Sequence, residues 1–223
     1  MKNEFKKRIV SSLIIVPITF FFIIKGSVFF TFFLGIFFLA TSYEWFKMNK
    51  KKSIKLIGIL YLLITFYCAL VLREFYGFEL FLFVIIICIF TDLGGYIFGK
   101  FFKGPKLTKI SPNKTYSGVL GGFVLSVIAG SIFSQKTYII SDQLNIIKSY
   151  IDYDIHPQTI LLLLILIISS TSQIGDLIIS YFKRLAKIKD TGKILPGHGG
   201  LLDRVDGIIF AIPLSYLLLS LLN

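Results

Sequence analysis

The chain has 223 residues, of which 55% are hydrophobic, and its formal net charge is +12. A soluble domain of this length could not bury so much apolar surface, because the buried fraction rises only slowly with chain length. With a mean hydropathy of +0.81, the composition excludes an ordinary soluble domain and predicts a single membrane domain.

Seven continuous apolar segments follow one another along the chain, and a membrane-spanning helix needs about 20 mainly apolar residues. Continuous apolar runs favour helices, whereas a β-barrel would show alternating ones. We therefore predict an all-α polytopic integral membrane protein with about seven transmembrane helices. The predicted spans are residues 9–24, 28–46, 56–72, 78–98, 116–133, 159–182 and 207–222.

The first segment could instead belong to a signal peptide, because basic residues precede it. No small-residue cleavage site follows it, so we expect an uncleaved anchor. The first three spans then form an N-terminal scaffold, residues 1–75, with few polar side chains away from the ends of its spans. Residues 76–223 form a catalytic region, whose cytoplasmic loops are residues 99–115 and 183–206.

Three side chains in or near the early spans are interpreted as structural. Glu44, near the inner end of the second span, could be functional, but it is expected at the membrane interface beside Trp45 and Lys47, an ordinary arrangement at the end of a span. Cys68 and Cys88 both lie in apolar segments. We expect them to be small core residues and not a disulfide or a metal site.

Lysine and arginine residues are distributed unequally between the two sides of the predicted membrane domain. With the N-terminus inside, 20 of the 24 fall on the inner side. This bias predicts a cytoplasmic N-terminus by the positive-inside rule. The cations flank spans and follow no nucleic-acid-binding motif, so we expect anionic membrane lipid and nucleotide phosphates as partners, and no nucleic acid. The four outer cations are Lys25, Arg73, Lys136 and Lys148.

The fourth predicted span is interrupted by Asp92, and the loop after it contains a hydroxyl–lysine–hydroxyl pattern. In that loop Ser111, Lys114 and Thr115 precede the next helix. Such a loop could bind phosphate through its side chains and the helix N-terminus. Alternatively, Ser111 belongs to an ordinary turn and Lys114 is an interfacial anchor. The pattern alone leaves both interpretations open.

The sixth predicted span ends in a polar stripe. Asp176, Ser180, Lys183 and Arg184 are spaced i, i+4, i+7 and i+8, which places them along one helix face. An ionised carboxylate inside a span is costly, so Asp176 should face a polar cavity, a metal or a cation. The alternative is a simple helix-surface pair between Asp176 and Lys183 or Arg184.

A glycine-rich turn, residues 196–200, comes before the last span and is followed by Asp203 and Asp206. Glycines let backbone N–H groups approach an anion closely. Two carboxylates three residues apart at a helix start suit Mg²⁺, which prefers oxygen ligands and substrate phosphates. Alternatively, the glycines only join two helices, and the acids only favour the start of a helix. His198 could donate to phosphate or be a structural turn residue.

Several common catalytic motifs are absent from the sequence. It contains no G-x-x-x-x-G-K-[ST] pattern, so it is not a P-loop NTPase. It also contains no G-x-S-x-G, H-E-x-x-H or C-x-x-C pattern. These absences direct attention to the polar residues near the inner ends of the spans.

Residues 180–206 resemble the signature of the phosphatidate cytidylyltransferase, or CDP-diacylglycerol synthase, family throughout their length. Two further family motifs are similar to Asp92…Tyr96 and to residues 111–118, so the resemblance extends from about Asp92 to the end of the chain. Gly95 and Asn113 depart from the family pattern, which has alanine and lysine there. The signature residues are Ser180, Lys183, Arg184, Lys189, Asp190, Gly192, Leu195, Pro196, His198, Gly199, Gly200, Asp203, Arg204 and Asp206.

This resemblance implies transfer of the cytidylyl group of CTP to phosphatidate, which forms CDP-diacylglycerol and pyrophosphate in phospholipid biosynthesis. It implies an Mg²⁺-dependent nucleotidyltransferase of the cytoplasmic (inner) membrane, with its active site facing the cytoplasm. It also implies a second, monovalent cation such as K⁺, and a homodimer.

The resemblance assigns a role to each matching residue. The implied catalytic residues are Asp176, Lys183, Arg184, Asp203, Arg204 and Asp206. The implied metal ligands are Asp92, Asp176, Asp203 and Asp206. The implied substrate-binding residues are Ser111, Lys114, Thr115, Ser180, Lys189, His198, Gly199 and Gly200.

Two other functions use similar residues. A CTP-dependent lipid kinase would need the same cations and metal but would release CDP, and the signature argues against it. A non-enzymatic anion transporter would need functional charges on both membrane faces, whereas nearly all of the charges here are predicted on the inner side.

Overall fold

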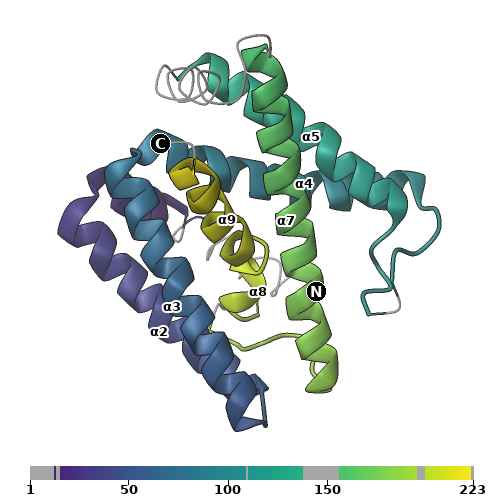
Figure 1. Cartoon of the computed structure of the whole chain (residues 1–223). Coiled ribbons are helices and arrows are strands. Elements are labelled where there is room, and N and C mark those ends of the chain that lie inside the picture. The colour runs from purple at the N-terminus through teal and green to yellow at the C-terminus, as the bar shows by residue number, and fades with distance from the viewer. Residues whose placement is uncertain (1–12, 14–15, 109, 138–155, 195–198, 222–223) are drawn as a thin grey trace.

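The computed structural model describes residues 13, 16–108, 110–137, 156–194 and 199–221, and most of these are helical (Figure 1). A short apolar helix, Val16–Lys25, precedes the labelled ones. In the described part of the chain, the only sheet-like pairing is an isolated bridge between Lys106 and Thr115. The labelled helices are α2 (Ser27–Met48), α3 (Lys52–Phe75), α4 (Phe78–Phe102), α5 (Tyr116–Gln135), α7 (Pro157–Leu185), α8 (Leu202–Val205) and α9 (Ile208–Leu221).

Helices α2, α3, α4, α5 and α7 are long and apolar enough to cross a membrane. They correspond to the second to sixth predicted spans, so the prediction of an all-α polytopic membrane protein is confirmed. Helix α9 has 14 residues, which is short for a span. The first predicted span lies partly outside the described residues. The count of seven spans and the cytoplasmic N-terminus therefore stay predictions.

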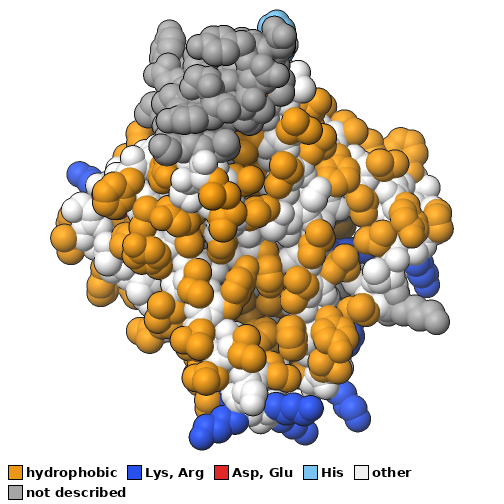
Figure 2. Space-filling view, viewed as in Figure 1, with side chains coloured by type: hydrophobic (Ala, Val, Ile, Leu, Met, Phe, Trp, Pro, Cys, Tyr) orange, Lys and Arg blue, Asp and Glu red, His pale blue; other side chains and the backbone are white. Residues whose placement is uncertain are grey.

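The outer surface of the bundle is apolar, as contact with lipid requires. Large side chains such as Phe32 and Leu39 on α2 are more than half exposed. Figure 2 shows apolar side chains over most of the visible face, with lysine and arginine side chains gathered mainly along its lower edge. In Figure 1 the α2–α3 turn and the end of α7 lie at that edge. Two of the predicted inner loops therefore lie at the same end of the bundle.

Helices α4 and α5 pack with their backbones in close contact. A Cβ atom at Gly94 would lie 2.2 Å from the carbonyl oxygen of Gly121, and one at Gly121 would lie 2.8 Å from that of Gly94. Glycine permits this approach, which explains why small residues are enriched between membrane helices. The contact holds α5, and the loop before it, against the half of α4 that carries Asp92.

Two hydrophobic clusters fill the interior. The larger lies between α2, α3, α4, α7 and α9 and includes Phe30 and the free thiols Cys68 and Cys88, which are core residues as predicted. The smaller contains Trp45 near the end of α2 and the fully buried Leu202 of α8. Helix α9 lies between α3 and α7 in Figure 1. Burial of Leu202 therefore anchors the short helix on which the signature ends.

Candidate active site

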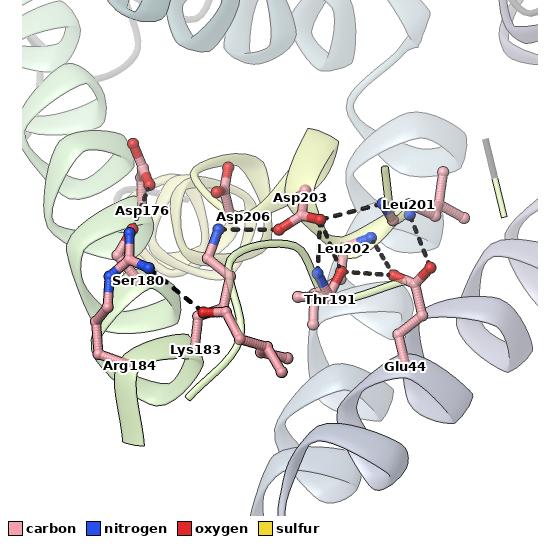
Figure 3. Close-up of polar contacts among 12 residues, drawn as sticks. Glu44, Asp176, Ser180, Lys183, Arg184, Thr191, Leu201, Leu202, Asp203 and Asp206 are labelled. Atoms are coloured by element: carbon pink, nitrogen blue, oxygen red, sulfur yellow. Dashed lines mark hydrogen bonds and ion pairs between the residues drawn. The ribbon is translucent and has the colours of Figure 1, made fainter. Parts of the chain in front are cut away.

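Asp203, on the short helix α8, accepts hydrogen bonds on both carboxylate oxygens (Figure 3). Its Oδ1 accepts from the Nζ of Lys183 at 2.9 Å. Its Oδ2 accepts from the backbone N–H groups of Thr191 at 2.8 Å and Gly200 at 3.1 Å. The side chains of Lys183 and Asp203 are only 11% and 8% exposed. Removal of either partner would leave a buried charge without compensation.

Burial and hydrogen bonding act in opposite directions on the Asp203 carboxyl. Burial alone would raise its pKa, but hydrogen bonds from Lys183, Thr191 and Gly200 outweigh this effect and lower the pKa below its ordinary value. Asp203 is therefore ionised at neutral pH. Its charge is matched by the ammonium group of Lys183.

A second buried carboxylate, Glu44 near the end of α2, reaches the same segment from the N-terminal scaffold. Its Oε1 accepts from the N–H of Leu201 at 3.0 Å, and its Oε2 from the N–H of Leu202 at 2.8 Å. The Thr191 hydroxyl lies 2.9 Å from the same Oε2. The interpretation of Glu44 as an interfacial residue is wrong, because it is 1% exposed. Three donors offset the cost of its burial.

The Thr191 hydroxyl lies between the two carboxylates, 2.9 Å from Glu44 Oε2 and 3.1 Å from Asp203 Oδ2. One hydroxyl hydrogen can serve only one acceptor at a time. Because Asp203 Oδ2 already accepts two backbone N–H groups, the hydroxyl hydrogen is best used by Glu44. The four side chains of Glu44, Thr191, Asp203 and Lys183 thus connect the end of α2 with the end of α7 (Figure 3).

The glycine-rich turn has a steric role in this network. A Cβ atom at Gly200 would lie 2.0 Å from the Thr191 hydroxyl oxygen and 2.6 Å from Glu44 Oε2. The preceding Gly199 has a φ of +87°, a conformation that favours glycine. Both glycines therefore allow the turn to wrap around the carboxylates. Their predicted contact with phosphate stays a prediction.

Asp176, within α7, forms an ion pair with the loop before α5. Its Oδ2 lies 2.5 Å from the Nζ of Lys114, and its Oδ1 accepts from the Ser180 hydroxyl at 3.2 Å. Thr115, next to Lys114, caps α5, because its hydroxyl oxygen accepts from the N–H of Gly118 at 3.1 Å. The alternative pairing of Asp176 with a basic residue of its own helix is wrong. The cation comes from a different loop.

A polar pocket of about 290 Å³ lies between α4, α5 and α7, beside this ion pair. It joins two regions that are far apart in the sequence, the Asp92 segment of α4 and the Asp176 stripe of α7. The loop that contains Lys114 lies between them. The polar lining includes Asp92, Ser111, Lys114, Thr115, Gln173 and Asp176.

The carboxylates around the pocket repel one another. Burial raises the pKa of Asp206 well above its ordinary value, and the negative charges of Asp176 and Asp92 raise it further. Within the described ranges, no three His, Cys, Asp or Glu side chains lie close enough to form a complete metal site. An incomplete set of oxygen donors suits Mg²⁺, which usually takes one or two carboxylates together with substrate phosphates. Asp92 and Asp176 both line the pocket, so they could supply two carboxylates to Mg²⁺ that is shared with a substrate.

The remaining predicted residues lie around this centre. Arg184 is exposed and donates to a backbone carbonyl in the loop before α5. Arg204, on α8, interacts electrostatically with Asp92. Lys189 is exposed in the segment after α7. His198 lies outside the described residues, so its role stays a prediction.

A sequence model of the cytidylyltransferase family matches residues 54–222, which is more than half of the chain. The chain belongs to the cytidylyltransferase family. The matched region contains the polar pocket and the Lys183–Asp203 pair but begins after Glu44. One contributor to the candidate site, Glu44, therefore comes from the unmatched N-terminal part of the chain.

Curated relatives of this chain carry the name phosphatidate cytidylyltransferase. The protein from Bacillus subtilis is 39% identical over 149 residues, 66% of this chain and 50% of that protein. Those from Staphylococcus saprophyticus and Staphylococcus aureus are 39% and 40% identical over 144 residues, 64% of this chain and 50% of each relative. The chain thus aligns with about half the length of the curated relatives it matches.

Sequence reasoning missed Thr191, and it assigned Glu44 to the membrane interface instead of to the site. Glu44 carried a usable signal, because a carboxylate at the end of an apolar span suggests function whenever it is not at the interface. Thr191 carried none, since a single threonine between charged residues is common in loops. Neither could be connected with Asp203 until the cytidylyltransferase fold brought α2 against α8.

Proposed function

We propose that this chain transfers the cytidylyl group of CTP to phosphatidate, giving CDP-diacylglycerol and pyrophosphate for phospholipid biosynthesis. The observation that supports this most is the juxtaposition of a carboxylate-lined pocket and a buried Lys183–Asp203 pair. Membership of the cytidylyltransferase family limits the chemistry to which this arrangement can be assigned. The name shared by the relatives supplies the proposed lipid substrate.

The reaction brings two polyanions together, so most of the catalysis should come from positioning and from neutralising charge. A phosphate oxygen of phosphatidate forms a bond to the α-phosphorus of CTP. The bond from that phosphorus to the oxygen bridging to the β-phosphate breaks, and pyrophosphate leaves with the electron pair. Phosphatidate is already anionic, so the chain does not need to supply a general base.

The basic side chains have distinct positions in this proposal. Lys183 is held in place by Asp203 and is buried, so it can offer a fixed positive charge to a substrate phosphate. Lys114 would bind phosphate at the pocket from the loop before α5. Arg184 and Arg204 are both exposed, and they would bind the triphosphate or the lipid phosphate.

Asp92 and Asp176, which both line the polar pocket, would hold Mg²⁺ together with substrate phosphates, and a contribution of Asp206 stays a prediction. A divalent cation held by these carboxylates would supply positive charge that offsets the negative charge of the substrate phosphates. Asp203 would join them only by exchanging its hydrogen bond with Lys183, because both of its oxygens already accept bonds in this structure. The monovalent cation and the homodimer implied by the resemblance stay predictions.

We further propose an inner-membrane location with the site facing the cytoplasm. The lysine and arginine residues at one end of the bundle support this orientation, because such residues are retained on the cytoplasmic side. In this orientation CTP would reach the site from the cytoplasm. Anionic lipid of the inner leaflet would approach the same end of the bundle.

The test uses purified protein, CTP labelled on the base or the α-phosphate, phosphatidate and Mg²⁺. Pyrophosphate release with a cytidine-bearing lipid supports the proposal, whereas release of CDP would instead identify a lipid kinase. Anion flux across liposomes without turnover of CTP would identify a transporter. Replacement of CTP by the other nucleoside triphosphates tests the base preference.

A further inference from the structure

An apolar cavity of about 430 Å³ lies inside the bundle, in addition to the polar pocket. Its walls come from α2, α3, α4, α9 and the Val16–Lys25 helix. Side chains in these walls are deeply buried, with exposed fractions of 0% for Phe30, 1% for Ala69 and 3% for Phe81. Other lining residues, Val16 and Ile89, are about half exposed, so the cavity has a buried interior and also opens to the outer surface of the bundle.

The lining of this cavity contains one charged side chain among the described residues, that of Arg204. Arg204 also interacts electrostatically with Asp92, which lines the polar pocket. Arg204 therefore lines the apolar cavity and interacts with a carboxylate of the polar pocket. A ligand that fits both would have an apolar body and an anionic end.

The cavity follows one face of α4 toward the polar pocket. Phe81, Ile85 and Ile89 line it at intervals of one helical turn, and Asp92 continues the same face beyond Ile89. At a rise of about 1.5 Å per residue, the stretch from Phe81 to Ile89 covers about 12 Å. If a methylene group takes nearly the space of a water molecule, about 30 Å³, the cavity holds about 14 of them.

We propose that this cavity, formed around Ala69, takes up one acyl chain of the phosphatidate substrate, while Arg204 faces the lipid phosphate. The inference rests on the proposed function. A bilayer is as apolar as the cavity, so the cavity adds little hydrophobic affinity. The cavity instead positions the substrate, because an acyl chain bound along α4 brings the lipid phosphate to the carboxylate-lined pocket.

The test fills the cavity and compares lipids of different chain length. Ala69→Phe places a large side chain in the cavity, and Gly35→Phe adds the same group to α2 where an added Cβ meets no atom within 4 Å. With Ala69→Phe, kcat/KM for dioleoyl phosphatidate should fall by about tenfold or more, as when a binding pocket loses its fit. The kcat/KM for dihexanoyl phosphatidate and the KM for CTP should stay within about twofold. Gly35→Phe should leave all three values near those of the unchanged protein.

Equal loss with both lipids, or no loss with either, would overturn the proposal. A second readout does not depend on turnover: dioleoyl-length phosphatidate with a diazirine on one acyl chain is photolysed in the presence of the protein. Crosslinks should map to the peptides of α3 and α9 that line the cavity, and Ala69→Phe should abolish them. Crosslinks confined to outward residues such as Phe32 and Leu39 would overturn the proposal. Failure of the unchanged protein to form any cytidine-bearing lipid would instead refute the proposed function.

Discussion

Replacement of Glu44 by glutamine tests whether the N-terminal scaffold holds the catalytic segment in place. The substitution keeps the size of the side chain but replaces one acceptor oxygen by a donor NH₂ group. Glu44 accepts three hydrogen bonds, from the backbone N–H groups of Leu201 and Leu202 and from the Thr191 hydroxyl. If the amide oxygen takes the place of Oε2, the N–H of Leu201 faces another donor.

The expected size of the effect follows from this count. Loss of a hydrogen bond to a charged group, with a buried donor left unsatisfied, costs about 1.5–3 kcal/mol. If the whole cost falls on the ordered form of the segment, the population of that form relative to displaced forms drops by about 10- to 100-fold. Because Leu201 and Leu202 lie next to Asp203, the displacement should reduce kcat more than it raises the KM for CTP.

The assay measures kcat and KM for Glu44→Gln, Glu44→Asp and Glu44→Ala in detergent or in liposomes. Glu44→Asp, which keeps the charge, should recover part of the lost activity, and Glu44→Ala should lose the most. Glu79→Gln, at the first turn of α4, is the matched control. A double-mutant cycle with Thr191→Val should show non-additive losses, since the two side chains are in contact. A kcat for Glu44→Gln within twofold of the unchanged protein would refute the reasoning.

Four further predictions concern the pocket and its supports. Asp203→Asn should abolish turnover while the protein still inserts and folds, because Lys183 loses its anionic partner; near-normal kcat would remove the pair from catalysis. Lys114→Met should lower kcat/KM by about tenfold or more, since a charge-assisted hydrogen bond is worth about 1.5–3 kcal/mol. The control for loss of charge in the same loop is Lys103→Met, at an exposed position. Gly200→Ala should cost about 1–3 kcal/mol or more of stability in a thermal or denaturant unfolding assay, because its Cβ would overlap the threonine hydroxyl; an unchanged unfolding midpoint would contradict the packing described. Chelation of divalent cations should stop the transfer, and Mg²⁺ should restore it, whereas transfer that persists in excess chelator would exclude a required divalent metal.

The helices of this protein could be predicted because continuous apolar runs are sufficient to identify them. The stripe on α7 was also predicted, and Ser180 does contact Asp176 one turn away. The expectation that Asp176 faces a polar cavity or a cation is confirmed, but the spacing could not identify which cation it meets. The partner, Lys114, is brought in by the α4–α5 contact, which depends on glycines whose meaning becomes clear only when both backbones are placed.

Glu44 shows the other limit of sequence reasoning. Its neighbours Trp45 and Lys47 are typical of a membrane interface, so local composition predicted an exposed carboxylate. The actual environment depends on Leu201 and Leu202, more than 150 residues away, whose backbone donors carry no signal in the sequence. Backbone donors of this kind become apparent only in three dimensions.

The close contact between Gly94 and Gly121 has a consequence for efforts to stabilise this protein. Replacing glycine by alanine inside a helix usually increases stability by about 1 kcal/mol. Both positions would therefore be chosen for substitution if each helix were considered alone. Here the added methyl group would meet a neighbouring backbone carbonyl, which cannot move aside as a side chain can. The two helices would have to separate, and the polar pocket would widen with them. A more helical variant would therefore have a wider polar pocket, because the distance between α4 and α5 depends on the absence of two methyl groups.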